Sequence, residues 1–490
     1  MSESKSNTQV DIQENINAKQ VNRLGTAKIS RLLLEFAIPS IIGLVVNGLY
    51  NLVDSIFLGH GVGEVGLATA TVAMPTMIFS MAMGVLIGAG GNALAALKLG
   101  EGKHDDAEKV LGNAFTLTVV AAVVCMLLVN VFMDPVLRIS GATEVTWEHA
   151  HTFVRIISFG FILQFFGMGF NNFIRTAGDP NRALYTMVAG TVLCIILNYL
   201  FVIVFKWGIA GSAWATVIGQ ALSAGLVLWY FAFSRKAPFK LKRKHLPIVP
   251  RLVGSIFALG SASFVLQIAA AILNLILNNQ LVYYGGLDPI GAEGAQAAIG
   301  VVQRVAMFAF FPILGVAMAA APLFGYNYGA QNFVRVRSAI LLSMAWVAAI
   351  GVFFWILIHL FPEQICIIFG IKDELLLFTI DALKVQVFFM PLVGLQVVAA
   401  NYFQSSGQPL KSMFLSLTRQ LLYLIPLLYL LPLLATHLNV PGLSAMDSPL
   451  EGLYYAFPIA DILSIVTAGT LMLLEFRKLG RRISLSTQIT

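Results

Sequence analysis

The chain has 490 residues, of which 58% are hydrophobic and only 11% are charged, and its mean hydropathy is +0.83. A soluble globular domain carries about 25% charged residues, so this composition excludes that class and predicts a polytopic membrane protein. The net charge of +7 does not indicate nucleic acid, because the basic residues stand in short loops beside apolar segments. The three cysteines are isolated in apolar runs, so we expect neither a disulfide nor a metal site.

The polar start, residues 1–28, lacks the short apolar core and small-residue cleavage site of a signal peptide. We expect it to be a disordered tail, and we expect the first apolar helix to be retained in the membrane. Apolar segments long enough for ~30 Å of hydrocarbon then follow. Twelve spans are expected, near residues 33–59, 67–97, 110–133, 152–174, 183–205, 210–233, 253–284, 295–325, 338–361, 380–403, 412–433 and 452–475.

Lysine and arginine decide the expected orientation of these spans. With the N-terminus inside, 25 of the 31 basic residues fall on the cytoplasmic side, five fall on the outer side and Arg304 stands within a span. Since cytoplasmic loops are enriched in Lys and Arg, and twelve spans are an even number, both termini are expected to be cytoplasmic.

A loop rich in basic residues and proline, from Ser234 to Arg251, divides the chain almost in half. We therefore expect a first lobe at 29–233, a cytoplasmic linker at 234–251, a second lobe at 252–476 and a cytoplasmic tail at 477–490. Six spans per half give both halves the same orientation, as in transporters built from parallel repeats. The repeat is visible as four pairs of residues spaced by 229, namely Gly100 and Gly329, Gly141 and Gly370, Gly178 and Gly407, and Pro180 and Pro409.

The first span carries a polar face. Asn47, Tyr50, Asn51 and Asp54 stand at i, i+3, i+4 and i+7, so a helix places them on one side of an otherwise apolar segment. A carboxylate at the centre of a membrane helix costs about 2.5–3.5 kcal/mol, which marks Asp54 as a candidate ion or proton site. The alternative is that Asp54 only forms hydrogen bonds that hold neighbouring helices together.

Counting 1.5 Å per residue places Asp54 in the outer half of the membrane. The same count brings Asn198 of the fifth span, and Thr216 and Gln220 of the sixth, to a similar depth. We therefore expect these residues, with Asn51, to form one ion-coupling pocket in the first lobe.

Polar residues in the spans of the second half are candidates for a substrate cavity, together with Asn47 and Tyr50. Single amides in spans more often form helix-packing hydrogen bonds. Arg304 and Asp461 each lie about nine residues from an outer helix end, so we expect them to pair, in either a structural or a gating role. The second-half candidates are Gln267, Asn274, Gln303, Arg304 and Asp461.

The sequence contains no phosphate-binding loop, no His-Glu-x-x-His and no Gly-x-Ser-x-Gly motif. We therefore expect no enzymatic activity, no metal and no cofactor. Without an ATP site, uphill transport would be driven by an ion gradient, and Asp54 is the leading candidate to couple it.

Several short motifs occur in a characteristic order, namely Ile38-Pro39, Val53–Gly59, Arg175–Pro180, Leu197–Leu200 and Gly208–Thr216, with echoes at Gln404–Pro409 and Glu451–Asp461. In these motifs and their order the sequence resembles the multidrug and toxic compound extrusion (MATE) transporters over residues 30–480. It looks most like the bacterial DinF-like and MepA-like branch.

The resemblance implies two six-helix lobes around a V-shaped cavity and export of organic cations in exchange for protons or sodium. By position, Asp54 matches the coupling acid of the first helix, Asn198 the asparagine of the fifth and Thr216 the threonine of the sixth. The sequence departs from the pattern at Val202, where related proteins often have an acid. The seventh span has Gln267 as its nearest polar residue, in place of the glutamate of another branch.

The expected function is therefore secondary active multidrug efflux by alternating access. The expected partners are small-molecule drugs or organic cations, and the lipid bilayer of a bacterial inner membrane. The protein is expected to be monomeric and to contribute to antibiotic resistance. The alternative is a lipid-linked oligosaccharide flippase of the same superfamily, which would need several deep cations for a pyrophosphate. An intramembrane enzyme or a channel is a weaker alternative, since no acid-base constellation is recognisable.

Overall fold

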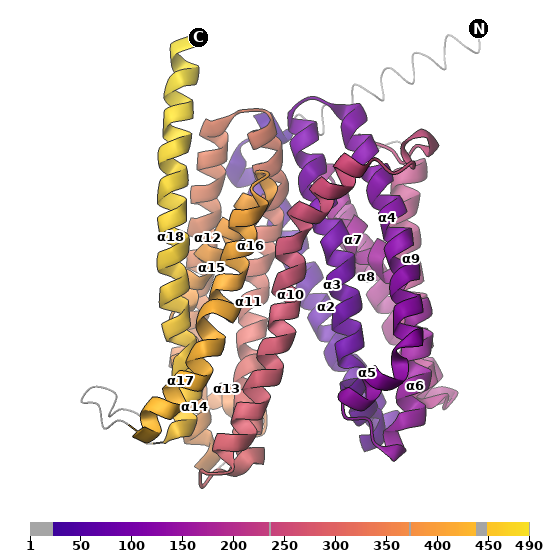
Figure 1. Ribbon diagram of the computed structural model, residues 1–490, viewed down its shortest axis with the longest axis vertical. Coiled ribbons are helices and arrows are strands. Elements are labelled where there is room, and N and C mark those ends of the chain that lie inside the picture. Colours follow the sequence, from indigo (N-terminus) through magenta and orange to yellow (C-terminus); the bar gives the residue numbers. More distant parts are fainter. Residues whose placement is uncertain (1–22, 235–236, 372–373, 438–447, 490) are drawn as a thin grey trace. The chain divides into compact units, whose positions relative to one another are not determined.

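The computed structural model describes residues 23–234, 237–371, 374–437 and 448–489. Within these ranges the chain is helical and has no strand (Figure 1). The side chains of a few residues inside helices, Asn51 among them, also lie outside the described part.

The first half contains six spans and one short helix. Where a continuous run forms a span, its most apolar window has a mean hydropathy of 1.5–2.5. Segments this apolar form long helices, because a helix pairs all of its backbone polar groups within the segment. The elements are α2 (Ile29–Gly61), α3 (Glu64–Gly100), α4 (His104–Val131), α5 (Met133–Ile139), α6 (Glu144–Phe159), α7 (Phe161–Thr176), α8 (Pro180–Asn198), the π-helical η1 (Tyr199–Val204) and α9 (Gly208–Phe233).

The second half repeats this order. After the 3₁₀ turn η2 (Arg243–His245) come α10 (Pro250–Gly285), α11 (Gly291–Gly329), α12 (Phe333–Leu360), α13 (Pro362–Ile368), α14 (Glu374–Gln386), α15 (Met390–Ser405), α16 (Pro409–Leu417), the π-helical η3 (Thr418–Leu424), α17 (Ile425–His437) and α18 (Pro449–Ile489).

Ten stretches of the described chain are long and apolar enough to cross a membrane, and two bent helix pairs raise the number to twelve. The bends are 53° between α6 and α7 and 46° between α14 and α15. The twelve expected spans and the all-α class are therefore confirmed. The first bend falls at Gly160, where an added Cβ would lie 2.8 Å from Val217 Cγ2, so glycine permits the close approach of α9.

The internal repeat is visible in the backbone. The short helices α5 and α13 have seven residues each, and their bounds differ by the same 229 residues as the repeated glycines. Each is followed by a left-handed glycine, Gly141 at φ 86° and Gly370 at φ 83°. Gly178 and Gly407 are also left-handed, and Pro180 and Pro409 begin α8 and α16. These matches confirm the parallel repeat.

The chain forms two compact units that do not follow the expected lobe boundaries. The first unit comprises residues up to 264, 318–339 and 403–409, and the second comprises 265–317, 340–402 and 410–490. The division cuts α10, α11, α12 and α15, and it separates Pro409 from the rest of α16. Part of the reason lies in the first unit, where an added Cβ on Gly100 of α3 would lie 2.0 Å from the backbone oxygen of Tyr326 in α11. Glycine thus lets these two backbones touch.

Part of the expected tail, residues 23–28, lies within the described chain. Residues 23–26 are helical and Leu24 is 1% exposed. The Arg335 guanidinium donates to the backbone oxygens of Leu24 at 3.2 Å and Ala27 at 2.7 Å, and so binds this segment within the first unit. The expectation of disorder up to residue 28 is therefore wrong for residues 23–28. Residues 1–22 lie outside the described ranges.

Candidate functional site

The site centres on Asp54 of α2, between α8 and α9. Its Oδ1 accepts a hydrogen bond from Asn198 Nδ2 at 2.8 Å and another from Ser212 Oγ at 3.0 Å. Asn198 and Ser212 are both fully buried. The structure thus brings together Asp54 and Asn198, which lie 144 residues apart in sequence, and adds Ser212, which the sequence did not single out.

A second polar contact lies one turn before Asp54. The Tyr50 hydroxyl is 2.9 Å from Thr216 Oγ1, and Cys194 Sγ is 3.9 Å from Thr216 Oγ1. Val202, at the position where related proteins often have an acid, is 1% exposed. The predicted polar face of the first span therefore meets polar residues from two other helices.

Tyr50, Cys194 and Thr216 border a cavity of about 230 Å³ in the first unit. Helices α2, α3, α7, α8 and α9 line it. Of the predicted residues, Asn47, Tyr50, Thr216 and Gln220 lie in its wall, while the Asn51 side chain is outside the described part. The sequence interpretation missed the polar side of the wall that α7 supplies, namely Gln164, Asn171, Asn172 and Arg175. Arg175 follows Asn171 by four residues and Asn172 by three, and Gln164 precedes Asn171 by seven residues, or two turns. This helical spacing is the signal that could have identified the face.

The cavity candidates of the second half do not line this cavity. Gln267 and Gln303 are half-buried and Arg304 is exposed. Asn274 is exposed and donates to the backbone oxygen of Ala270 in its own helix at 2.9 Å.

The expected pair of Arg304 and Asp461 is wrong. Asp461 is 1% exposed, and its Oδ1 is 2.6 Å from Arg419 Nε. Arg419 stands ten residues after Pro409, within the helical run that leads through η3. Counting residues from helix ends gives the depth of a side chain but not the direction in which it faces. Asp461 pairs with Arg419 because α18 packs beside η3.

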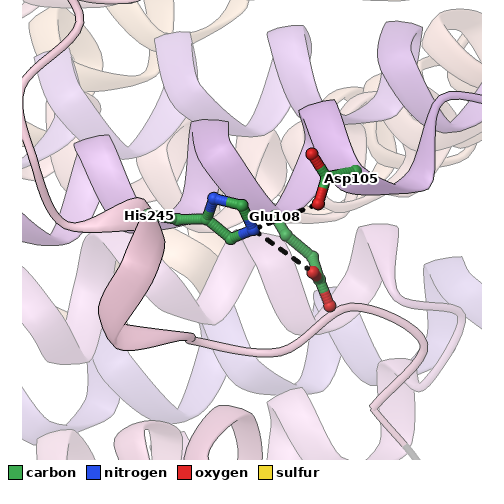
Figure 2. A group of neighbouring side chains, drawn as sticks. All are labelled: Asp105, Glu108 and His245. Atoms are coloured by element: carbon green, nitrogen blue, oxygen red, sulfur yellow. Dashed lines mark ion pairs between the residues drawn. The ribbon is translucent and has the colours of Figure 1, made fainter.

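A third polar group joins the linker to α4. His245 Nε2 is 3.3 Å from Asp105 Oδ1 and 3.6 Å from Glu108 Oε2 (Figure 2). One possible metal-ligand atom from each of these three residues lies within 4.8 Å of the other two, which is close enough for one metal ion. The carboxylates already have cationic partners, however, since Lys242 Nζ is 2.6 Å from Glu108 and Lys244 Nζ is 3.2 Å from Asp105.

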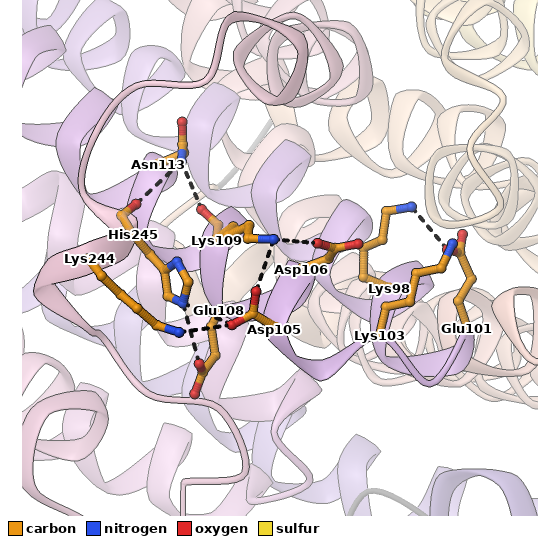
Figure 3. Close-up of polar contacts among 10 residues, drawn as sticks. All are labelled: Lys98, Glu101, Lys103, Asp105, Asp106, Glu108, Lys109, Asn113, Lys244 and His245. Carbon is orange, nitrogen blue, oxygen red and sulfur yellow. Dashed lines mark hydrogen bonds and ion pairs between the residues drawn. The ribbon is translucent and has the colours of Figure 1, made fainter.

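Figure 3 shows this network continuing along the start of α4. Lys109 Nζ lies 2.9 Å from Asp105 and 3.0 Å from Asp106. In the preceding turn, partial burial works to raise the pKa of Glu101, but hydrogen bonds from Lys103 and Lys98 hold that pKa below its usual value. The arrangement is that of an ion-pair network which fixes the linker on α4.

Comparisons with known proteins were made on sequence and on fold. Residues 39–200 and 292–430 match the family model MatE. The chain is 25% identical over 379 residues to the probable multidrug resistance protein YoeA of Bacillus subtilis strain 168, covering 76% of this chain and 80% of that protein. It is 21% identical over 384 residues to the multidrug export protein MepA of Staphylococcus haemolyticus, covering 78% and 82%.

A FAD transporter of Shewanella oneidensis is 23% identical over 465 residues, which cover 91% of this chain and 94% of that protein. Among solved structures, the outward-facing conformation of a multidrug resistance MATE family transporter of the MOP superfamily matches with a TM-score of 0.85. The match covers 94% of this chain and 98% of that chain at 22% identity. At this identity the likeness shows a shared fold.

Proposed function

Because the chain belongs to the MATE family of membrane transporters, we propose that it is a secondary active multidrug exporter that exchanges organic compounds, cations among them, for protons or sodium ions. It is a multi-pass membrane protein and not an enzyme. We place it in a bacterial inner membrane as a monomer with both termini in the cytoplasm, following the distribution of Lys and Arg.

The observation that carries the proposal is the environment of Asp54. A carboxylate in a membrane span is expensive, and by default it marks an ion or proton path. Here it is held by two donors, Asn198 Nδ2 and Ser212 Oγ, beside a cavity in the same unit. A proton or sodium ion arriving at Asp54 would change the charge of the group that orders these contacts.

The cavity offers a place where the exported compound would bind. Tyr50 and Thr216 border it and touch each other at 2.9 Å, one helical turn from Asp54. We propose that ion loading at Asp54 rearranges this contact and so alters the wall that a substrate meets. The ion at Asp54 and the substrate in the cavity would then each affect the binding of the other through the same face of α2, which is the coupling that exchange needs.

A flippase for lipid-linked oligosaccharides is less well supported. A pyrophosphate carries several negative charges and needs several cations. Arg175 is the cation among the residues that line the described cavity, and Arg304 of the second half is exposed.

The test is gradient-driven uptake of ethidium into everted vesicles, with Asp54→Asn against wild type. We expect the variant to accumulate no more dye than vesicles without the protein, at every pH at which wild type is active. Asp134→Asn is the matched control, because the Asp134 side chain is 63% exposed and lies outside the site. If Asp54→Asn exports as well as wild type at acidic and alkaline pH, the coupling role is wrong.

Whether the coupling ion is a proton or sodium is decided by the same vesicles. If protons are exchanged, added substrate should collapse an imposed proton gradient in the absence of sodium. If sodium is exchanged, added substrate should collapse an imposed sodium gradient and leave the proton gradient unchanged.

A further inference from the structure

The wall of the cavity contains a buried positive charge. Arg175 lies in the last turn of α7 and is 3% exposed. It shares the cavity with the polar face of α2 that leads to Asp54. The site described so far makes no use of this arginine.

The Arg175 guanidinium has few acceptors for its five N–H groups. Nη1 donates to Asn172 Oδ1 at 2.7 Å, and Nη2 meets Met187 Sδ, a weak acceptor, at 3.6 Å. Nε has no hydrogen-bond partner, and neither has Oδ1 of the neighbouring Asn171, which is 2% exposed. Among the residues that the structure describes, no carboxylate lies within 4.0 Å of Arg175.

Two other arginines of the first unit do have a carboxylate partner. Arg182 is 3.2 Å from Asp179 and Arg23 is 2.8 Å from Glu35. A buried charge without a counter-ion costs several kcal/mol. The end of α7 offers only about half a unit of negative charge through its backbone carbonyls. The missing partner is therefore an anion.

We propose that Arg175 binds the carboxylate of the transported compound, so that the substrate class includes organic acids and zwitterions as well as cations. One planar guanidinium fits one carboxylate, whereas a multiply charged phosphate needs more cations. The apolar part of the ligand would lie against Met81, Met168 and Leu44, which also line the cavity. This assignment rests on the proposed export function, because it takes the cavity to be part of the transport route.

The experiment measures binding to the purified full chain in nanodiscs of zwitterionic lipid. The probes are 7-diethylaminocoumarin-3-carboxylate and its neutral 3-carboxamide, titrated by fluorescence. We expect wild type to bind the carboxylate about tenfold more tightly than the carboxamide, as for a charged hydrogen bond in a buried site. Equal affinities would overturn the proposal.

Asn172→Asp is the most informative variant. It is nearly isosteric and places a fixed carboxylate on the atom that Arg175 already contacts at 2.7 Å. We expect it to lose the preference for the coumarin carboxylate while still binding the carboxamide, which also shows that it is folded. Arg175→Gln should lose the same preference, and Arg182→Gln, at an arginine already paired, should keep it. A preserved preference in Asn172→Asp would contradict the assignment.

A second arm distinguishes a substrate from a lipid headgroup. If phosphatidylglycerol in the nanodiscs abolishes the preference of wild type, the anion bound at Arg175 is a lipid phosphate and the assignment to substrate is wrong. Binding needs no ion gradient, so the outcome is independent of the vesicle assay. Failed export with an intact preference would overturn the export function alone, and the reverse result would overturn only the carboxylate site.

Discussion

At the scale of single residues, Ser212 is the group that completes the environment of Asp54. Its hydroxyl donates to the same oxygen, Oδ1, that Asn198 contacts. Both donors come from helices that surround α2, so the carboxylate is held from two directions. The position of the charge is thus set by one amide and one hydroxyl.

We predict that Ser212→Ala weakens export. A hydrogen bond to a charged group contributes about 1.5–3 kcal/mol, so export at a fixed gradient should fall by about tenfold. Ser212→Thr keeps the hydroxyl and should retain most of the activity. Ser338→Ala, at an exposed serine that bonds only within its own helix, should match wild type. Ser212→Ala with wild-type export would show that Asn198 alone suffices.

Asp54 and Asn198 were predictable because a carboxylate and an amide stand out in apolar spans. Ser212 was not, because in Gly211-Ser212-Ala213 it reads as one of three small packing residues. Arg175 belongs to the motif Arg175–Pro180, but its burial without a carboxylate partner could not be predicted, because it depends on which helix faces meet. The pairing of Asp461 with Arg419 instead of Arg304 depends on the same information.

At the scale of elements, the linker between the halves is a docked segment. Asn113 Oδ1 accepts from the Val249 backbone N–H at 2.7 Å, and Thr116 Oγ1 donates to the Leu246 backbone oxygen at 2.7 Å. Glu108 adds its contact with Lys242. Side chains of α4 therefore hold the linker at several points along its length.

We predict that Glu108→Gln releases the linker. Glu108 is 8% exposed and accepts from the Lys240 backbone N–H at 3.1 Å as well as from Lys242. Its neutralisation should cost about 1–3 kcal/mol locally, and amide hydrogen exchange over residues 237–249 should accelerate. Asp106→Asn is the control, because the Asp106 side chain is 40% exposed and does not touch the linker in any described contact. If amide exchange is unchanged in Glu108→Gln, the contacts of Asn113 and Thr116 hold the linker without the charge of Glu108.

The spans themselves were predictable from long apolar runs, and their order and number are as expected. The bend between α6 and α7 was not, because it falls at Gly160 and not at a proline. The docking of the linker was equally hidden, since it joins residues 130 positions or more apart, such as Thr116 and Leu246.

At the scale of the whole molecule, the 229-residue repeat explains how one sequence plan builds both halves. The short helices α5 and α13 and their left-handed glycines recur at the same spacing. The sequence resemblance to MATE transporters and the repeat together predicted this plan. The unit boundaries were not predictable, because they depend on where α3 meets α11 rather than on chain order.

The repeated pair Gly100 and Gly329 makes that meeting possible. A Cβ on Gly100 would lie 2.0 Å from the Tyr326 backbone oxygen, and a Cβ on Gly329 would lie 2.2 Å from the Leu97 backbone oxygen. Backbone atoms cannot turn aside as a flexible side chain can. Either substitution must therefore separate the two helices within the first unit.

We predict that Gly100→Ala and Gly329→Ala each destabilise the protein by about 1–3 kcal/mol, as overpacking does, seen as a lower thermal midpoint in detergent. Gly254→Ala is the control, because an added Cβ there meets nothing within 4 Å and alanine favours helix by about 1 kcal/mol. The double variant should cost less than the sum of the single variants, since one separation of α3 from α11 relieves both clashes. Additive losses would show that the two glycines act at independent contacts.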